Sequence, residues 1–435
     1  MKRFFGFLKP SITFTDWQGE VITLDPPDKV VLPISQPGHM PFNPVVEVGE
    51  TVKTGQFIAM LPSRTGVHAT VTGKVISIGP GYNNEGQEVL TITIRRESDD
   101  DLIAPHPVQN LEKISREELL EVLAELGFGF PWKPESLREK LTEEERLPFD
   151  TIIIFAVDTE PPISVQRRFL TEFADDFRES IVAIKKLAGD ARVVVVVPDS
   201  MAGQARSLLK DVDIYPVKNS TLDTNPRMLI HKITHKFIGF YDSPRRHGIV
   251  TLSAEDVAFA ERCLHKGKSR TNKLVTVWSP VMDKPVTVRV RLGTPVRHIL
   301  SSLSISVSSG DRVIFGGPLM GIAQPDLDSC ISLSTDGVYV LPASRITHFY
   351  DEPCINCGRC VKICPVHIQV NIVGRYAEFG LFEQAVQRGS GSCVECGLCA
   401  YVCPSHRPLM QYMRFANIQY KHILESRPAD EEEGA

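Results

Sequence analysis

Hydrophobic residues follow different spacings in successive parts of the chain, and each spacing predicts a different kind of structure. Between residues 25 and 95, short β-branched runs such as Gly73–Ile78 are separated by Gly, Pro and Asn, which predicts short strands. Between residues 150 and 260, apolar strands such as Thr151–Ala156 and Arg192–Pro198 alternate with helical stretches. Alternation of this kind predicts βαβ units and a parallel sheet, so we expect a multidomain α/β protein.

Three helices are predicted with particular clarity. Ser115 and Glu118 have the spacing of a capping box, in which Ser is the N-cap and Glu follows three residues later. The residues that follow form an apolar stripe that predicts core packing: Leu119, Leu120, Leu123 and Leu126. Longer helices are predicted for Val165–Leu187 and for Val370–Gln387.

The cysteines near the C-terminus carry the strongest chemical signal. Eight of the ten cysteines form two copies of the pattern C-x2-C-x2-C-x3-C-P, which is typical of [4Fe-4S] clusters. In the two-cluster arrangement, the fourth cysteine of each run ligates the cluster of the other run. The first predicted cluster is therefore held by Cys354, Cys357, Cys360 and Cys403. The second is held by Cys393, Cys396, Cys399 and Cys364.

Other uses of these cysteines fit the spacing less well. Structural zinc also uses C-x2-C pairs, but it needs four ligands and its pairs are usually further apart. Disulfides are disfavoured because the chain shows no secretory signal and because the spacings are those of a redox cofactor. Cys263 and Cys330 lie outside the pattern and are expected to be packing residues.

Composition narrows the class of protein further. The chain of 435 residues has 42% hydrophobic and 23% charged residues, as in ordinary globular proteins. Its net charge of -5 argues against a nucleic-acid-binding protein. No apolar run approaches the roughly 18 residues that a membrane helix needs, so no transmembrane segment is predicted.

The order of these segments resembles the C subunit of the Rnf ion-translocating electron-transport complex. The residues that carry the resemblance are Val46–Gln56, His68–Gly73, Gly316–Gly321 and the cysteine segment through Leu409. The resemblance implies a β barrel-sandwich over residues 1–100, related to lipoyl domains but without the carrier lysine. It further implies an α/β domain resembling the flavin subunit of complex I (101–270), an SLBB (β-grasp-like) domain (271–345), a helical ferredoxin-like domain with two [4Fe-4S] clusters (346–418) and an acidic tail (419–435).

In that family the central domain binds FMN and NADH, and the resemblance carries this site over to Gly127, Gly129, Phe130, Lys133 and Glu160. The family's glycine-rich loop is altered in this chain, because one glycine is lost and tryptophan replaces threonine at position 132. Its Glu-Cys-Glu-Pro run is altered too, and begins with Asp158. These departures favour a retained fold with an empty or altered site, although a working site stays open.

The resemblance implies a peripheral oxidoreductase and translocase subunit on the cytoplasmic face of the cell membrane. It would relay single electrons through two [4Fe-4S] clusters between a soluble ferredoxin or a cytochrome and the integral-membrane and iron–sulfur subunits. If the flavin site works, the chain is instead the NADH-exchanging end of the complex. Two further alternatives are an iron–sulfur subunit of the heterodisulfide-reductase or glycolate-oxidase type, and a structural adaptor in which the clusters serve only to stabilise the fold.

Basic residues close in sequence to the cysteines would raise the potential of a neighbouring cluster, with solvated surface charge as the alternative. They are Arg359, Lys362, His367, His406 and Arg407.

Overall fold

The structure is a computed structural model that describes residues 19–35, 42–61, 66–83, 86–103, 113–126, 149–347 and 352–426. The described residues form two compact units. The sheet unit contains residues up to 218 together with residues 248–345, and the cluster unit contains residues 219–247 together with the residues from 346 onward.

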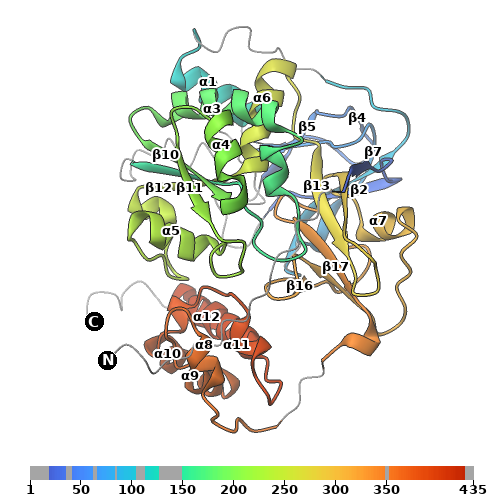
Figure 1. Ribbon diagram of the computed structural model, residues 1–435. Helices are drawn as coiled ribbons and strands as arrows, with labels where there is room; N and C mark the ends of the chain where they lie inside the picture. Colours follow the sequence, from blue (N-terminus) through green and yellow to red (C-terminus); the bar gives the residue numbers. More distant parts are fainter. Residues whose placement is uncertain are drawn as a thin grey trace. The chain divides into compact units, whose positions relative to one another are not determined.

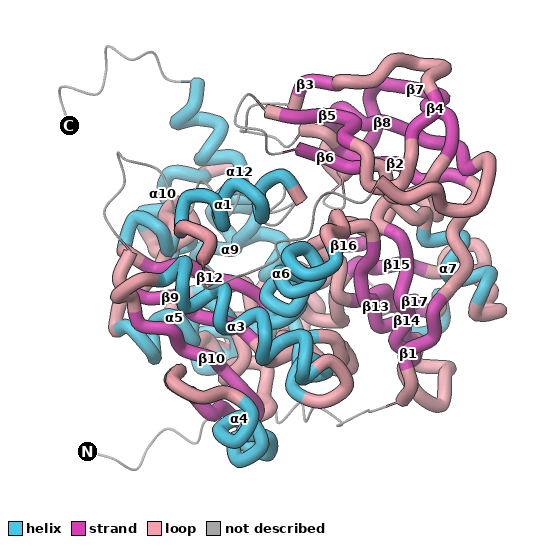
Figure 2. The backbone as a smooth tube through the Cα atoms, turned by 90° about the horizontal axis from the view of Figure 1, so that it is seen from above, coloured by secondary structure: helices cyan, strands magenta, loops and turns pink. Residues whose placement is uncertain are grey.

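The N-terminal part of the sheet unit is a β sandwich, as the sequence predicts. One antiparallel sheet has the strand order β2-β8-β7-β4, and a second has the order β3-β5-β6 (Figure 2). Their strands are β2 (Lys29–Pro33), β3 (Asn43–Pro44), β4 (Thr51–Val52), β5 (Phe57–Met60), β6 (Gly66–His68), β7 (Gly73–Tyr82) and β8 (Glu88–Arg96). Alternate apolar residues such as Val30, Leu32, Ile92 and Ile94 fill the core. Gly73 is required, because a Cβ there would lie 2.0 Å from the Arg95 carbonyl oxygen.

The predicted parallel sheet is confirmed, with the strand order β11-β10-β9-β12 and every pair parallel. Its strands are β9 (Thr151–Phe155), β10 (Arg192–Pro198), β11 (Asp213–Val217) and β12 (Ile249–Ser253). The β-branched residues of β9 and β10 are buried on both faces, as in the central strands of parallel sheets. Helices α3 (Ala174–Ala188) and α6 (Ala254–Lys266) pack together against this sheet (Figure 1).

Helix α1 (Arg116–Glu125) begins with the predicted capping box. The Glu118 N–H donates to Ser115 Oγ at 3.1 Å, and the Ser115 N–H donates to Glu118 Oε2 at 3.0 Å. The predicted leucine stripe is buried in the core of the sheet unit. Both predictions are confirmed.

The single helix predicted for Val165–Leu187 is wrong. A buried 3-10 turn, η1 (Gln166–Leu170), comes first, and α3 begins only at Ala174. Asp158 Oδ1 accepts the N–H groups of Val165 and Gln166 at 2.8 Å each, which caps the start of η1. The helical conformation is then interrupted at Thr171, whose φ of -128° and ψ of -85° separate η1 from α3.

A six-stranded sheet completes the sheet unit, with the order β1-β14-β13-β17-β15-β16. Its strands are β1 (Val21–Thr23), β13 (Asn272–Trp278), β14 (Val286–Arg291), β15 (Arg312–Phe315), β16 (Ile322–Ala323) and β17 (Gly337–Leu341). Helix α7 (Val296–Ser302) packs on its core. The sequence did not predict that β1, from the N-terminal segment, pairs in parallel with β14.

The cluster unit is helical, as predicted for the C-terminal domain. Its helices are α5 (Pro226–Thr234), α8 (Arg359–Ile363), α9 (Val370–Glu378), α10 (Phe382–Gln387), α11 (Leu398–Tyr401) and α12 (Leu409–Ser426). The predicted helix Val370–Gln387 is two helices, because Gly380 adopts a φ of 72° between them. Residues 219–247, which the sequence assigned to the α/β domain, belong to this unit. The predicted start of an acidic tail at residue 419 falls inside α12, which continues to Ser426. The other predicted domain boundaries stay predictions.

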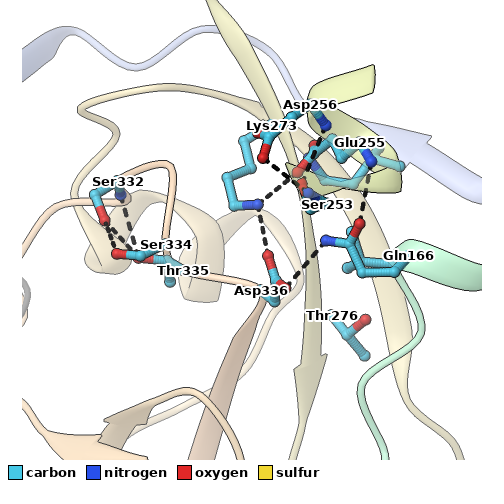
Figure 3. Close-up of polar contacts among 12 residues, drawn as sticks. Gln166, Ser253, Glu255, Asp256, Lys273, Thr276, Ser332, Ser334, Thr335 and Asp336 are labelled. Atoms are coloured by element: carbon cyan, nitrogen blue, oxygen red, sulfur yellow. Dashed lines mark hydrogen bonds and ion pairs between the residues drawn. The ribbon is translucent and has the colours of Figure 1, made fainter. Parts of the chain in front are cut away.

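A buried ionic network joins helix α6 and the turn η1 to the six-stranded sheet (Figure 3). Lys273 of β13 is 2% exposed, and its Nζ lies 2.6 Å from both Glu255 Oε2 and Asp336 Oδ1. Gln166 accepts the Glu255 N–H at 3.1 Å and donates to Asp336 at 3.2 Å. Burial alone lowers the pKa of Lys273, but the two carboxylates outweigh it, so the pKa is raised and the ammonium stays charged.

Replacement of Lys273 by Met is expected to destabilise the sheet unit by about 3–5 kcal/mol, because Asp336 then loses the Lys273 ammonium and Glu255 is left with one cation, the Arg270 guanidinium at 3.4 Å. The matched control is Lys29→Met, which removes an exposed ion pair with Asp328 and is expected to cost about 0–1 kcal/mol. Urea unfolding followed by tryptophan fluorescence measures both, since Trp278 stacks on Tyr339 in the same sheet. Equal midpoints for the two variants would show that the network does not stabilise the sheet unit.

Candidate metal centre

Two cavities in the cluster unit bring together the eight motif cysteines. The first is lined by Cys354, Cys357, Cys360 and Cys403, and the second by Cys364, Cys393, Cys396 and Cys399. Each cavity therefore takes three cysteines from one motif and the fourth from the other, which is the crossed arrangement that the spacing predicts.

The backbone of the two motifs follows the same course. Three left-handed residues occur at matching positions, in the pairs Asn356 and Glu395, Gly358 and Gly397, and His367 and His406. Both glycines directly precede a short helix that carries the third cysteine of its motif. Left-handed residues between helical ones turn successive backbone N–H groups toward one point, which suits an anionic cluster.

The donor set fits an iron–sulfur cubane. Four thiolates, one for each iron, is the usual ligand set of a [4Fe-4S] cluster. In the described residues, no three His, Cys, Asp or Glu side chains are grouped so as to hold a single metal ion. Burial raises the pKa of Cys360 to about 11 and that of Cys393 to about 12, so both thiols are protonated in the metal-free chain at neutral pH. Cluster assembly must then release these protons.

The surroundings of the two cavities differ. Residues with apolar side chains dominate the second cavity, among them Val366, Val370, Met410 and Met413. The first cavity is lined by polar and charged residues as well, including Arg359, Asn371 and Arg407.

Of the basic residues predicted near the cysteines, Arg407 has a structural role. It is buried, it forms an ion pair with Glu378, and it donates to the Glu352 carbonyl at 2.8 Å. Arg359, Lys362, His367 and His406 are exposed.

Two residues that hold the second motif were missed by the sequence analysis. Asn225 donates to the Val394 carbonyl at 3.0 Å, and Arg227 donates to the Cys393 carbonyl at 2.7 Å. Asn225 is also the N-cap of α5, since its side chain accepts the Met228 N–H. An Asn-Pro pair is a recognisable helix start, but its spacing carries no information on a contact 169 residues away.

The residues predicted for flavin and nucleotide binding are only partly described. Gly127, Gly129, Phe130 and Lys133 lie outside the described residues. Glu160 is buried in the sheet unit, where its carboxylate accepts the N–H groups of Gly317, Leu319 and Met320 at 2.7–3.2 Å. This carboxylate therefore occupies the amide-lined glycine-rich turn at residues 316–321.

Asp158, the other carboxylate of the altered run, also serves the fold. Its Oδ1 accepts two backbone N–H groups, and its Oδ2 lies 3.4 Å from Arg167 Nε. Burial raises its pKa, against the opposing effect of Arg167 and the backbone donors. Binding of FMN and NADH by this chain stays a prediction.

A β sandwich followed by α/β layers and a helical dicluster domain defines an iron–sulfur electron-transfer protein. Two family models match the chain: the RnfC barrel sandwich hybrid domain over residues 13–99, and the 4Fe-4S dicluster domain over residues 353–407.

Relatives match most of the chain. The C subunit of the ion-translocating oxidoreductase complex of Rhodobacter capsulatus is 30% identical over 417 residues, which cover 91% of this chain and 79% of that protein. The C subunit of the proton-translocating ferredoxin:NAD(+) oxidoreductase complex of Clostridium ljungdahlii is 26% identical, covering 88% of this chain and 86% of that protein. Its Na(+)-translocating counterpart from Acetobacterium woodii is 24% identical, covering 82% and 83%. The chain belongs to the RnfC family, which comprises the C subunits of ion-translocating oxidoreductase complexes.

Replacement of Asn225 by Ala is expected to loosen the second motif. It removes a helix cap and leaves the buried Val394 carbonyl without its side-chain donor, at a cost of about 1–3 kcal/mol. The control is Asn272→Ala, because Asn272 is exposed and its side chain donates only to the neighbouring Thr271. The measurement is the urea midpoint for loss of the cluster absorbance in the visible range. If Asn225→Ala retains the midpoint of Asn272→Ala, the contact does not support the motif.

Proposed function

We propose that this chain is the peripheral electron-transfer subunit of a membrane-bound Rnf-type oxidoreductase that translocates ions. The observation that carries the proposal is the crossed sharing of eight cysteines between two cavities of one helical unit. The proposed ligands are Cys354, Cys357, Cys360 and Cys403 for one [4Fe-4S] cluster and Cys393, Cys396, Cys399 and Cys364 for the other.

The chain's own residues support a relay. When bound, a [4Fe-4S] cluster accepts and gives up one electron at a time. Since each motif gives its fourth cysteine to the other cavity, the two proposed sites are held next to each other by the chain itself. The apolar lining at Met410 and Met413 keeps water from the second site. Cys364 and Cys393 each accept a backbone N–H at 3.4 Å, a contact that stabilises a thiolate.

Exchange of electrons with NADH would need a flavin, because a nicotinamide delivers a hydride that a one-electron centre cannot accept. In this chain Asp158 and Glu160 are committed to backbone donors of the sheet unit. That commitment favours the relay over the alternative, in which the chain is the NADH-exchanging end of the complex.

The proposed partners are integral-membrane and iron–sulfur subunits of an Rnf-type complex, because the relatives are named as subunits of such complexes. A soluble ferredoxin or a cytochrome would be the partner on the other side. In the described part of the chain, no helix has the length and apolar character to span a bilayer. We place the subunit on the cytoplasmic face of the membrane, where its partners would carry out ion translocation.

We also propose the domain organisation expected from the sequence, with two changes: residues 219–247 pack in the cluster unit, and the cluster domain continues to the end of α12 at Ser426. The six-stranded sheet with its glycine-rich turn supports an SLBB domain over residues 271–345.

Single cysteine replacements test the ligand assignment. Cys364→Ser is expected to lose the second cluster and keep the first, although Cys364 lies in the first motif. Cys403→Ser is expected to do the reverse. Iron and sulfide analysis would show loss of up to half of each, and electron paramagnetic resonance of the reduced protein would show one signal in place of two. Cys330→Ser is the control and is expected to keep both. Loss of the first cluster in Cys364→Ser would contradict the crossed assignment.

An anaerobic visible spectrum tests the relay itself. The full chain is reconstituted with iron, sulfide and FMN, washed, and treated first with NADH and then with dithionite. We expect dithionite alone to bleach the broad band near ~400 nm, with no flavin retained after washing. Bleaching by NADH would show that the flavin and nucleotide sites work, and would replace the relay by the alternative function.

A further inference from the structure

The two cysteine motifs have the same backbone conformation, but the second is buried by other residues of its unit and the first is exposed. Val394, between the first two cysteines of the second motif, is only 4% exposed, and Cys396 is buried as well. At the matching positions of the first motif, Ile355 is 66% exposed and Cys357 is exposed. Both motifs lie in the same unit and share one sequence pattern. The difference in exposure therefore comes from the residues that pack on each motif.

Residues 219–247 provide the cover of the second motif. Asn225 and Arg227, at the start of α5, donate to the carbonyls of Val394 and Cys393. The Phe240 N–H donates to the Gly391 carbonyl at 2.7 Å. The contact is close, because a Cβ on Gly239 would lie 3.1 Å from that same oxygen. The chain thus closes its second motif with a segment of its own.

At the first motif, the apolar side chain of Ile355 is exposed, and basic residues lie near it. Arg359 and Lys362 of α8 are exposed, and neither forms an ion pair in the described residues. Arg375 is exposed and donates to Asn356 Oδ1 at 2.8 Å, which holds its charge beside Ile355. Glu352 is the acidic residue nearest in sequence among those described, and the three cations outnumber it. An exposed aliphatic residue with Arg359 in the same cavity lining, Arg375 held by the neighbouring Asn356, and Lys362 exposed on the same helix as Arg359 is suited to a transient protein contact.

On the basis of the proposed function, we infer that Ile355, Cys357, Arg359, Lys362 and Arg375 form a docking surface for an electron-transfer protein with an acidic face. The partner covers Ile355 as residues 219–247 cover Val394, and its carboxylates meet the three cations. One electron then passes between the partner's redox centre and the cluster at Cys354, Cys357, Cys360 and Cys403. One centre is oxidised as the other is reduced, and no proton or atom is transferred.

The test uses the full chain with both clusters and, as partner, a chemically reduced [2Fe-2S] ferredoxin with an acidic surface. Stopped-flow absorbance measures the rate of electron transfer at low and high salt. We expect Ile355→Glu, and separately the double variant Arg359→Glu with Lys362→Glu, to slow the reaction at least tenfold at low salt. The unaltered chain is expected to slow as salt rises, because the steering charges are screened.

Val281→Glu is the control for Ile355→Glu, with similar exposure and the same charge change, and Arg388→Glu is the control for reversal of an exposed cation. Val281→Glu alters an aliphatic residue that is 72% exposed in the sheet unit, and Arg388→Glu reverses an exposed cation in the cluster unit. Both are expected to keep the ferredoxin rate within about twofold. A wild-type ferredoxin rate in Ile355→Glu and in the double variant would overturn the docking surface. So would a wild-type reaction that is insensitive to salt, a measurement that needs no substitution.

Failure of the underlying function would look different. If the two-cluster assignment is wrong, dithionite gives no electron paramagnetic resonance signals from two clusters in the unaltered chain, and if the NADH-exchanging alternative is right, NADH bleaches the cluster band of the unaltered chain. If only the docking surface is wrong, both signals appear and the variants react with ferredoxin at the wild-type rate.

Discussion

Neither cavity of the cluster unit is complete without a cysteine from the other motif, and most of this unit follows from that constraint. Cys364 must reach the cavity of Cys393, Cys396 and Cys399, while Cys403 must reach the cavity of the first motif. The two motifs therefore have to lie side by side. The 28 residues between Cys364 and Cys393 have to leave and return within one compact fold, which α9 and α10 achieve with a turn at Gly380. A longer continuous helix would carry the second motif away from the first.

The sheet unit shows carboxylates used for structure at positions where the family resemblance led us to expect ligand binding. Glu160 occupies a glycine-rich turn whose amides could otherwise face a phosphate, and Asp158 follows the strand β9 and fixes the start of η1. Amide donors are strongly directional, so a carboxylate that satisfies three of them is difficult to recruit for another purpose. The same unit uses Lys273, Glu255 and Asp336 to join helix α6 to the six-stranded sheet. The buried polar groups named here thus stabilise the fold of this unit.

Local patterns predicted the features that depend on neighbouring residues. Cysteine spacing predicted the grouping of the motif cysteines, and the reciprocal bonds of Ser115 and Glu118 follow from three-residue spacing alone. The features that were missed depend on distant residues. The pairing of Val21 with Thr287 joins two segments that lie far apart in the sequence, and Asn225 meets Val394 only after folding. Helical periodicity also could not show that the chain would leave the helical conformation at Thr171, between η1 and α3.

The two motifs differ in exposure because residues 219–247 of the same chain pack on the second motif and bury it. A buried carbonyl needs a donor, and at the second motif the chain supplies two side-chain donors and one backbone donor from residues 219–247. At the first motif, Ile355 and Cys357 are exposed, and Ile355 contributes exposed apolar area. A permanent cover there would stabilise the chain but block electron exchange, because electrons pass readily only over short distances. An open loop beside a closed one is therefore consistent with a protein that holds one centre inside its own fold and offers the other to a partner.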